Sequence, residues 1–110
     1  MIRNLTRDSL VAALPRQASS FRERLFGLIG QDFSTFDAMI FSSCNAIHTF
    51  FMGYPIDVIF ADRDKKVLKT VEKFPPFRPY AGTIKAYWTI ELPSGALAKS
   101  GTQQGDILDF

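Results

Sequence analysis

The sequence is poor in the residues on which small scaffolds and many active sites depend. Its 110 residues include one cysteine and one histidine. A single cysteine permits no internal disulfide, so a disulfide scaffold is excluded and packing has to supply the stability. A single histidine does not make the ligand cluster of a zinc site, and we expect no metal and no cofactor.

Long apolar segments are also missing. No stretch approaches the roughly 18–20 apolar residues that a membrane span needs. The apolar run at residues 10–14 is shorter than the core of a signal peptide, and Asp8 precedes it. We therefore expect a soluble, cytoplasmic protein without a membrane partner.

The net charge of +2 is small, but the bases are unevenly placed. The segment from residue 63 to residue 85 holds Asp64 and Glu72 and a larger group of bases: Arg63, Lys65, Lys66, Lys69, Lys73, Arg78 and Lys85. This excess fits contact with phosphate, nucleic acid or an acidic partner, and it also fits the solvated side of a hairpin protected by lysines. We favour the hairpin, because the aromatic interleaving typical of single-strand binders is weak here. A small molecule or a protein is the expected partner, and nucleic acid is not.

Length and composition bound the fold. A chain of 110 residues makes one domain, and an apolar fraction of 46% with eleven phenylalanines indicates a substantial core. The patterns predict an α+β, β-dominated fold, a compact mixed or antiparallel sheet or partial barrel with one main helix near residues 20–30. Ser20 and Glu23 resemble a capping box at the start of that helix, and Gly30 is its stop signal.

Short apolar runs between turn residues predict the strands. The clearest strand is 55–61, which the polar turn 62–66 joins to a hairpin partner at 67–71. The remaining predictions are an extended pair within 1–18 that turns at 6–9, strands at 38–41, 48–52, 86–92 and 107–110, a proline-rich surface loop at 75–79, and one helical turn at 96–100.

Cys44 and His48 are the first candidates for chemistry. Side chains four residues apart meet on a helix, whereas on a strand they lie about 13 Å apart, too far for one zinc ion. A metal site or a Cys–His nucleophilic pair oriented by Asp57 therefore needs a folded-back loop. The favoured alternative is a small buried cysteine and a hydrogen-bonded histidine at the edge of the core.

Asp57 and Glu91 are acids set inside strand patterns. Asp57 shares a strand face with Ile59 and Ala61, which predicts partial burial and fixed hydrogen-bond donors. If the two acids face each other, they form an acid/base pair with separated pKa values. The alternative is structural: Asp57 fixes the corner at residues 53–55, and Glu91 pairs with an arginine, Arg24 or Arg78.

Several spaced blocks resemble one family. They are Arg24-Leu25-Phe26-Gly27-Leu28, Met39-Ile40-Phe41, His48 to Met52 with Pro55 to Phe60, Pro76-Phe77-Arg78, and Glu91 to Gly95 with Gly105-Asp106. In this order they resemble the family called domain of unknown function 192, a small bacterial and archaeal domain, from about Arg22 to Phe110. The first twenty residues match poorly. The chain also departs from the family pattern at Phe51, Gly53, Phe77 and Trp88.

The resemblance implies a mostly β fold with a short helix and no established reaction, and we assign no catalytic residue. The candidate binding residues come from the matching blocks: Arg24, His48, Phe50, Met52, Asp57, Arg78, Glu91 and Asp106. Polar groups among aromatic side chains are typical of ligand sites, so the leading hypothesis is a non-enzymatic binding or accessory domain with a shallow pocket near the His48–Asp57 block.

Two alternatives remain open. One is a small hydrolase or transferase that uses Asp57 and Glu91, or Cys44 and His48. The other is an interaction module whose interface is an exposed patch of Phe33, Phe36, Phe74 and Phe77.

Overall fold

The structure is a computed structural model, and it describes residues 1–18, 33–43, 46–47, 54–75 and 81–110. The helix expected near residues 20–30, the strand at 48–52 and most of the proline-rich loop lie outside the described residues. Within those ranges the chain is β-dominated, with one short helix, α2 (Ala96–Ser100). The predicted α+β, β-rich class is confirmed.

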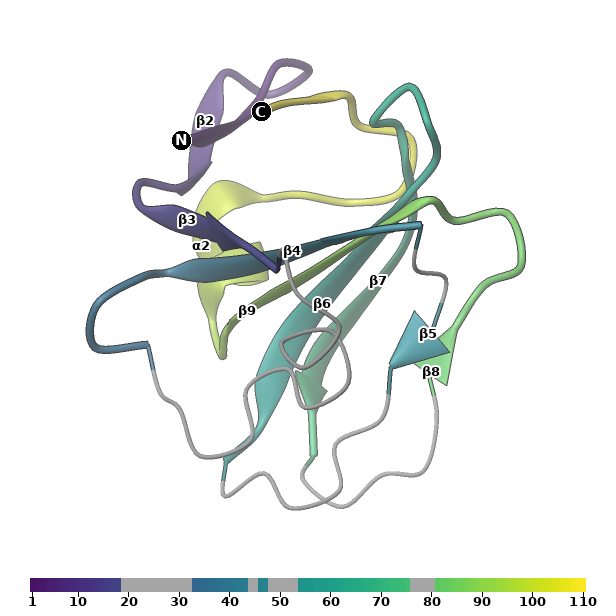
Figure 1. The fold of residues 1–110 in the computed structure, drawn as a ribbon. Helices are drawn as coiled ribbons and strands as arrows, with labels where there is room; N and C mark the ends of the chain where they lie inside the picture. The colour runs from purple at the N-terminus through teal and green to yellow at the C-terminus, as the bar shows by residue number, and fades with distance from the viewer. Residues whose placement is uncertain (19–32, 44–45, 48–53, 76–80) are drawn as a thin grey trace.

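A five-stranded sheet in the order β3-β4-β9-β6-β7 forms the centre of the molecule (Figure 1). β3 and β4 run parallel and every other neighbouring pair is antiparallel, so the sheet is mixed. Its strands are β3 (Pro15–Gln17), β4 (Ala38–Ser42), β6 (Ile56–Ala61), β7 (Val67–Phe74) and β9 (Trp88–Pro93).

Two smaller sheets accompany it. One has the order β10-β1-β2 and joins the two ends of the chain, which lie together at the top of Figure 1. Its strands are β1 (Ile2–Asn4), β2 (Ser9–Ala12) and β10 (Leu108–Asp109). The other pairs β5 (Ala46–Ile47) with β8 (Ala81–Gly82). The described strands form no closed barrel.

The strand predictions that fall within the described residues are confirmed in place, with changed ends. β7 continues to Phe74 instead of stopping at Val71, and β9 begins at Trp88 instead of Ala86. The sequence does not predict β3 as a separate strand, because its hydrogen-bonded partner β4 lies far away in the chain. Long-range pairing of this kind leaves no local pattern.

The central sheet is buried on both faces, and this divides the core in two. All six residues of β6 are buried. Ile56, Val58 and Phe60 belong to one cluster, while Ile59 belongs to the other, as the period-two pattern predicts. We call the two groups the Phe60 cluster and the Ile59 cluster. The Phe60 cluster contains Ala18, Phe36, Met39, Phe41, Ile56, Val58, Phe60 and Phe74.

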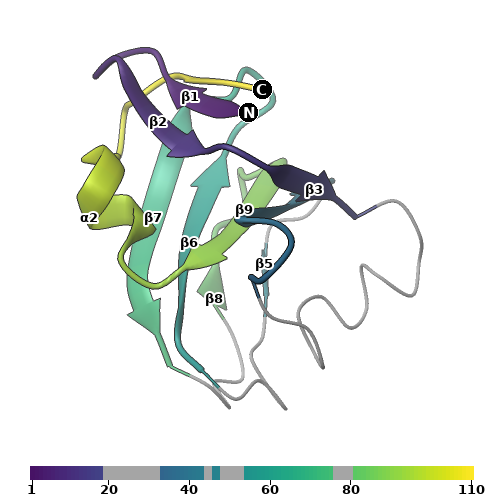
Figure 2. The ribbon, with the colours of Figure 1, turned by 90° about the vertical axis from the view of Figure 1, so that its left-hand side faces the viewer.

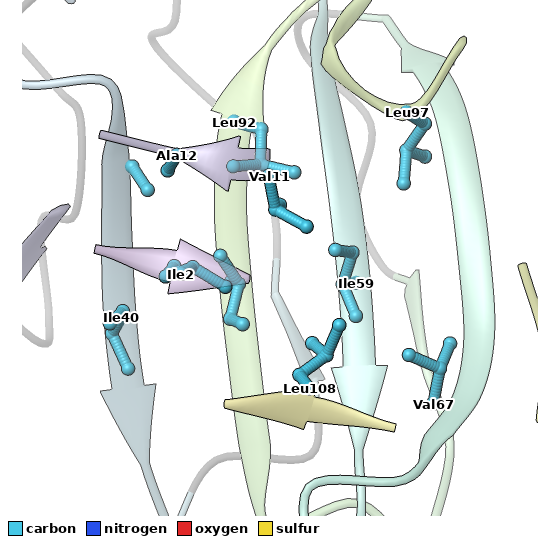
Figure 3. Packing of buried hydrophobic residues seen from close by; sticks show 11 residues of the cluster. Ile2, Val11, Ala12, Ile40, Ile59, Val67, Leu92, Leu97 and Leu108 are labelled. Atoms are coloured by element: carbon cyan, nitrogen blue, oxygen red, sulfur yellow. The ribbon is translucent and has the colours of Figure 1, made fainter. Parts of the chain in front are cut away.

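The Ile59 cluster lies between the central sheet, the three-stranded sheet and α2 (Figures 2 and 3). Ile40, Ile59 and Leu92 come from the central sheet, and Ile2, Val11 and Leu108 cover them from the sheet of the chain ends (Figure 3). Leu97 closes the cluster from α2. The segments at the two ends of the chain thus complete the core.

The exposed aromatic patch expected of an interaction module is not present in the described residues. Phe36 and Phe74 are each only 7% exposed and belong to the Phe60 cluster, and Phe33 packs against the same cluster. Phe77 lies outside the described residues. The prediction was wrong for the three described phenylalanines, because burying large rings stabilises the fold more than leaving them in water.

The burial of Ile59 leads to a stability prediction. Ile59→Ala leaves a cavity where the three-stranded sheet covers the central one, so we expect a loss of about 2–5 kcal/mol in the free energy of unfolding. Leu14→Ala is the control, because Leu14 is 66% exposed and its change should stay within about 0.5 kcal/mol. Urea denaturation measures both, and equal losses would contradict this description of the core.

Candidate functional site

Asp57 occupies a fully enclosed position on β6, where its side chain is held by backbone amides. It is 1% exposed. Its Oδ1 accepts a hydrogen bond from the amide of Lys73 (2.9 Å), and its Oδ2 accepts from the amides of Gly95 (3.1 Å) and Leu97 (2.9 Å). Three donors satisfy a buried carboxylate well. The predicted fixed donors are present, but these three belong to β7 and to the β9–α2 turn and not to the corner at residues 53–55.

Each of these contacts fixes an irregular backbone position. Lys73 has φ +50° and lies at a register shift between β6 and β7, so its amide is free of the regular ladder. Gly95 has φ +99° at the start of α2, a conformation that favours glycine. Asp57 therefore determines where β9 ends and where α2 begins.

A groove lies beside this turn, between β2 and the start of α2. Its cavity volume is about 380 Å³. The lining residues are Leu10, Val11, Ala12, Ala13, Asp37, Pro93, Ser94, Gly95, Ala96 and Lys99. Most of this wall is aliphatic or backbone, and Asp57 holds one side of it through the amide of Gly95.

Two charged residues border the groove, and they differ in how they are engaged. Both carboxylate oxygens of Asp37 accept amide hydrogen bonds of 2.7 Å, from Ala13 and from Leu14. Asp37 therefore fixes the bend between β2 and β3. Lys99 is exposed, and its ammonium makes no ion pair with a described residue. It remains available to a ligand.

Glu91 lies on the opposite face of the central sheet, the face that carries the Phe60 cluster. Its register partners are Met39 on β4 and Val58 on β6, and it is 4% exposed. Oε2 has no hydrogen-bond partner among the described residues. Burial raises the pKa of Glu91 from 4.5 to about 8, because the charged form loses its hydration.

The two acids do not form a pair. Asp57 is the register partner of Leu92, and cross-strand partners point to the same face of a sheet. Glu91, the neighbour of Leu92, therefore points to the opposite face. The sheet separates the two carboxyl groups, so an acid/base mechanism that uses both has no geometric basis.

Asp106 belongs to a polar network that ties the chain ends together. Its Oδ2 accepts hydrogen bonds from Asn4 Nδ2 (2.8 Å), Arg7 Nε (2.7 Å) and the amide of Gln103 (3.1 Å). Burial alone would raise the pKa of Asp106, but the bonds from Asn4 and Gln103 and the hydrogen bond and charge of Arg7 outweigh it, and the pKa is lowered. Asn4 also donates to Thr102 Oγ1 (3.1 Å). The network stabilises the pairing of the N-terminal and C-terminal segments.

The structure does not bring the candidate binding residues into one site. Asp57, Glu91 and Asp106 have three separate environments, described above. The remaining candidates lie outside the described residues, as does Cys44: Arg24, His48, Phe50, Met52 and Arg78. Across the described ranges, no group of three acidic, histidine or cysteine side chains is placed to hold a metal ion. None of the described helices has the length and apolar character to cross a membrane.

Comparison with known proteins gives the family. The model of the family domain of unknown function 192, described as Uncharacterized ACR, matches residues 5–110, and the chain belongs to this family. The match starts at residue 5, so it includes most of the segment before Arg22. β1 and β2 belong to the fold because β1 pairs with β10 and their side chains complete the Ile59 cluster.

Two solved structures share the fold. A protein of unknown function from Novosphingobium aromaticivorans DSM 12444 has 21% identity and a TM-score of 0.72, covering 87% of this chain and 74% of its own. A putative transcription regulator from Sinorhizobium meliloti 1021 has 19% identity and a TM-score of 0.76, covering 86% of this chain and 79% of its own. No curated protein matches the chain. At these identities the likeness concerns the fold alone.

Sequence reasoning missed the residues that line the groove. Ala12 is the last residue of β2 and Ala13 follows it, and Lys99 lies on a short helix about eighty residues later. Of the lining residues, only Pro93, Ser94 and Gly95 fall in a block that resembles the family motif. Nothing in the local pattern links the two segments, which meet through the Ile59 cluster.

Glu91 makes stability depend on pH. A pKa of about 8 in the folded state against 4.5 means that the folded protein binds the proton more tightly, so the contribution of Glu91 is fully present below pH 4.5 and is lost as the pH rises toward 8. We expect Glu91→Gln to be more stable than the parent protein at pH 8, by roughly 3–5 kcal/mol because one pKa unit is worth about 1.4 kcal/mol. The difference should vanish near pH 4.5. Urea denaturation at both pH values measures it, with exposed Glu72→Gln as the control, and a gain that is the same at both pH values would contradict the assignment.

The contribution of Asp106 to stability should depend on pH in the opposite direction. Its lowered pKa means that its stabilising contribution is present above 3.8 and is lost as the pH falls below that value. Asp106→Asn should therefore destabilise the protein at pH 7. The difference in the free energy of unfolding between this variant and the parent protein should become smaller below pH 3.8. Asp109→Asn, at an exposed position of β10, is the control. If the difference in the free energy of unfolding is the same in acid as at pH 7, the charge of the Asp106 carboxylate is not the cause of the stabilisation.

Proposed function

We propose that this protein is a non-enzymatic binding domain that holds a small ligand in the groove between β2 and the β9–α2 turn. The observation that carries the proposal is a preformed hollow of about 380 Å³ whose wall is fixed from behind by the buried carboxylate of Asp57. Small-molecule sites commonly have volumes of about 300–1,000 Å³, apolar walls and few polar groups.

The character of the walls supports binding more than catalysis. Asp37 is engaged by two amides and Asp57 by three, so the described contacts of both carboxylates fix the backbone around the groove. Lys99 is the charged group at the groove that the described contacts leave available. A mainly apolar wall with two charged residues, Asp37 and Lys99, provides affinity and orientation for a ligand.

The alternative is a small hydrolase or transferase. Its Asp57–Glu91 form is weakened because the two side chains point to opposite faces of the sheet. Its Cys44–His48 form concerns residues outside the described ranges. No described contact favours either form, and binding remains the proposal with direct support.

A groove-filling variant tests the proposal. A thermal-shift screen with nucleotides, sugars, amino acids and short-chain carboxylic acids should yield a compound that raises the melting temperature, because a ligand at one hundred times its dissociation constant adds about 2.7 kcal/mol. Ala13→Trp places a large side chain in the groove and should abolish the shift. Ala98→Trp is the matched control, since Ala98 is exposed on α2 and does not line the groove, and it should keep the shift. A ligand that stabilises both variants equally, or a screen without any shift, would overturn the proposal.

A further inference from the structure

The turn between β6 and β7 presents cationic side chains from a rigid backbone. Oδ1 of Asp62 accepts hydrogen bonds from the amides of Asp64 (2.9 Å) and Lys66 (3.0 Å), and the amide of Asp62 donates to the carbonyl of Lys66 (3.0 Å). This local network fixes the turn. Arg63 and Lys66 are exposed on it.

Three aromatic rings lie against this turn, and they come from distant parts of the sequence. The amide of Tyr87 donates to the carbonyl of Ala61 (2.8 Å), which places the start of β9 beside the end of β6. Trp88 contacts the ring of Tyr87 edge to face at 5.1 Å and that of Phe110 at 5.1 Å. Tyr87, Trp88 and Phe110 thus form a continuous aromatic row.

The cations of the turn lie directly over these rings. The guanidinium carbon of Arg63 is 4.5 Å from the ring centre of Tyr87. The ammonium of Lys65 is 4.3 Å from the ring centre of Phe110 and 5.8 Å from that of Trp88, and it donates to the carbonyl of Phe110. Cations held over aromatic faces are stabilised there and keep a fixed position.

The adjoining loop adds to the same surface. Lys69 donates to the carbonyl of Gly82 (3.3 Å), at the start of the loop that leads to Tyr87. Ile84 and Lys85 form the tip of this loop, and Ile84 is 89% exposed. We call this surface the basic end, and it consists of Arg63, Lys65, Lys66, Lys69, Ile84, Lys85, Tyr87, Trp88 and Phe110. The acids within or next to its segments are Asp62, Asp64 and Asp109, and Asp62 is engaged by the turn.

The sequence by itself favours a solvated hairpin for these lysines, because few aromatic residues stand between them. The tertiary structure supplies the rings from β9 and from the end of the chain. Cations that contact phosphates, together with flat aromatic and guanidinium surfaces on which bases stack, are the two components of single-strand recognition.

We propose that the basic end binds single-stranded nucleic acid. Lys66, Lys69 and Lys85 contact phosphates, and a base stacks on the guanidinium of Arg63, which Tyr87 supports from beneath. An acidic peptide would use the cations but has no need of the stacked pair of Arg63 and Tyr87, and this favours the nucleic acid. The proposal is independent of the ligand groove, because the basic end lies at the start of β9 and the groove at its other end.

Fluorescence anisotropy with a labelled 15-nucleotide oligodeoxythymidine tests the proposal, between 50 and 200 mM salt. The double variant Lys66→Gln/Lys85→Gln removes two exposed phosphate-contacting cations, so it should bind more weakly and should reduce the slope of log affinity against log salt by about 1.4, since each phosphate contact to a single strand contributes about 0.7. The matched control is Arg16→Gln/Lys73→Gln, which removes the same charge from exposed positions away from the basic end and should keep the slope.

Tyr87→Leu separates stacking from charge. It removes the aromatic support of Arg63 and should weaken binding about tenfold, because a stacked base contributes at this scale. Tyr87→Phe keeps the ring and should bind as the parent protein does. The proposal is overturned if the oligonucleotide does not bind at 50 mM salt, if the control double variant loses as much affinity for it as the test variant, if Tyr87→Leu binds it as tightly as the parent protein does, or if polyglutamate or phosphatidylserine vesicles bind the parent protein more tightly than the oligonucleotide does.

Discussion

The hydrogen bonds of Asp57 are the constraint on which the arrangement of this protein depends. One carboxylate on the buried strand β6 receives an amide from β7 and two from the β9–α2 turn. It thereby fixes a register shift, the end of the central strand β9 and the start of α2. Because α2 places Leu97 in the Ile59 cluster and Gly95 on the groove wall, the position of one acid determines both the packing of that face and the shape of the proposed site.

Glu91 differs from Asp57, because the described residues do not satisfy its side chain in the same way. It lies on the neighbouring strand and on the other face of the sheet, and the described residues give its Oε2 no partner. A buried carboxyl oxygen that lacks a donor among the described residues is retained at a cost in stability, and the burial raises the pKa of Glu91. The two acids thus have different roles: the carboxylate of Asp57 is hydrogen-bonded and structural, whereas Glu91 is buried with a raised pKa and one oxygen without a described partner.

The two proposed surfaces lie at opposite ends of β9, and both are built by distant segments. The groove joins β2 to the β9–α2 turn, and the basic end joins the β6–β7 turn to Tyr87 and Phe110. The pairing of β1 with β10 makes this possible, because it brings the two ends of the chain onto one face of the central sheet. Asp106 reinforces that pairing through Asn4 and Arg7.

The sequence by itself determined the strands and the residues that they bury. Alternation along residues 55–61 assigns Val58 and Ile59 to opposite faces, the polar turn 62–66 predicts the hairpin, and spaced motifs indicate the family, since each of these signals is local. Only the tertiary structure decided what the polar residues do. Asp57 meets amides that lie sixteen to forty residues away, Glu91 is left without a described donor, and the groove and the aromatic row combine segments from both ends of the chain. Contacts between distant segments depend on strand order and register, which a one-dimensional pattern does not contain.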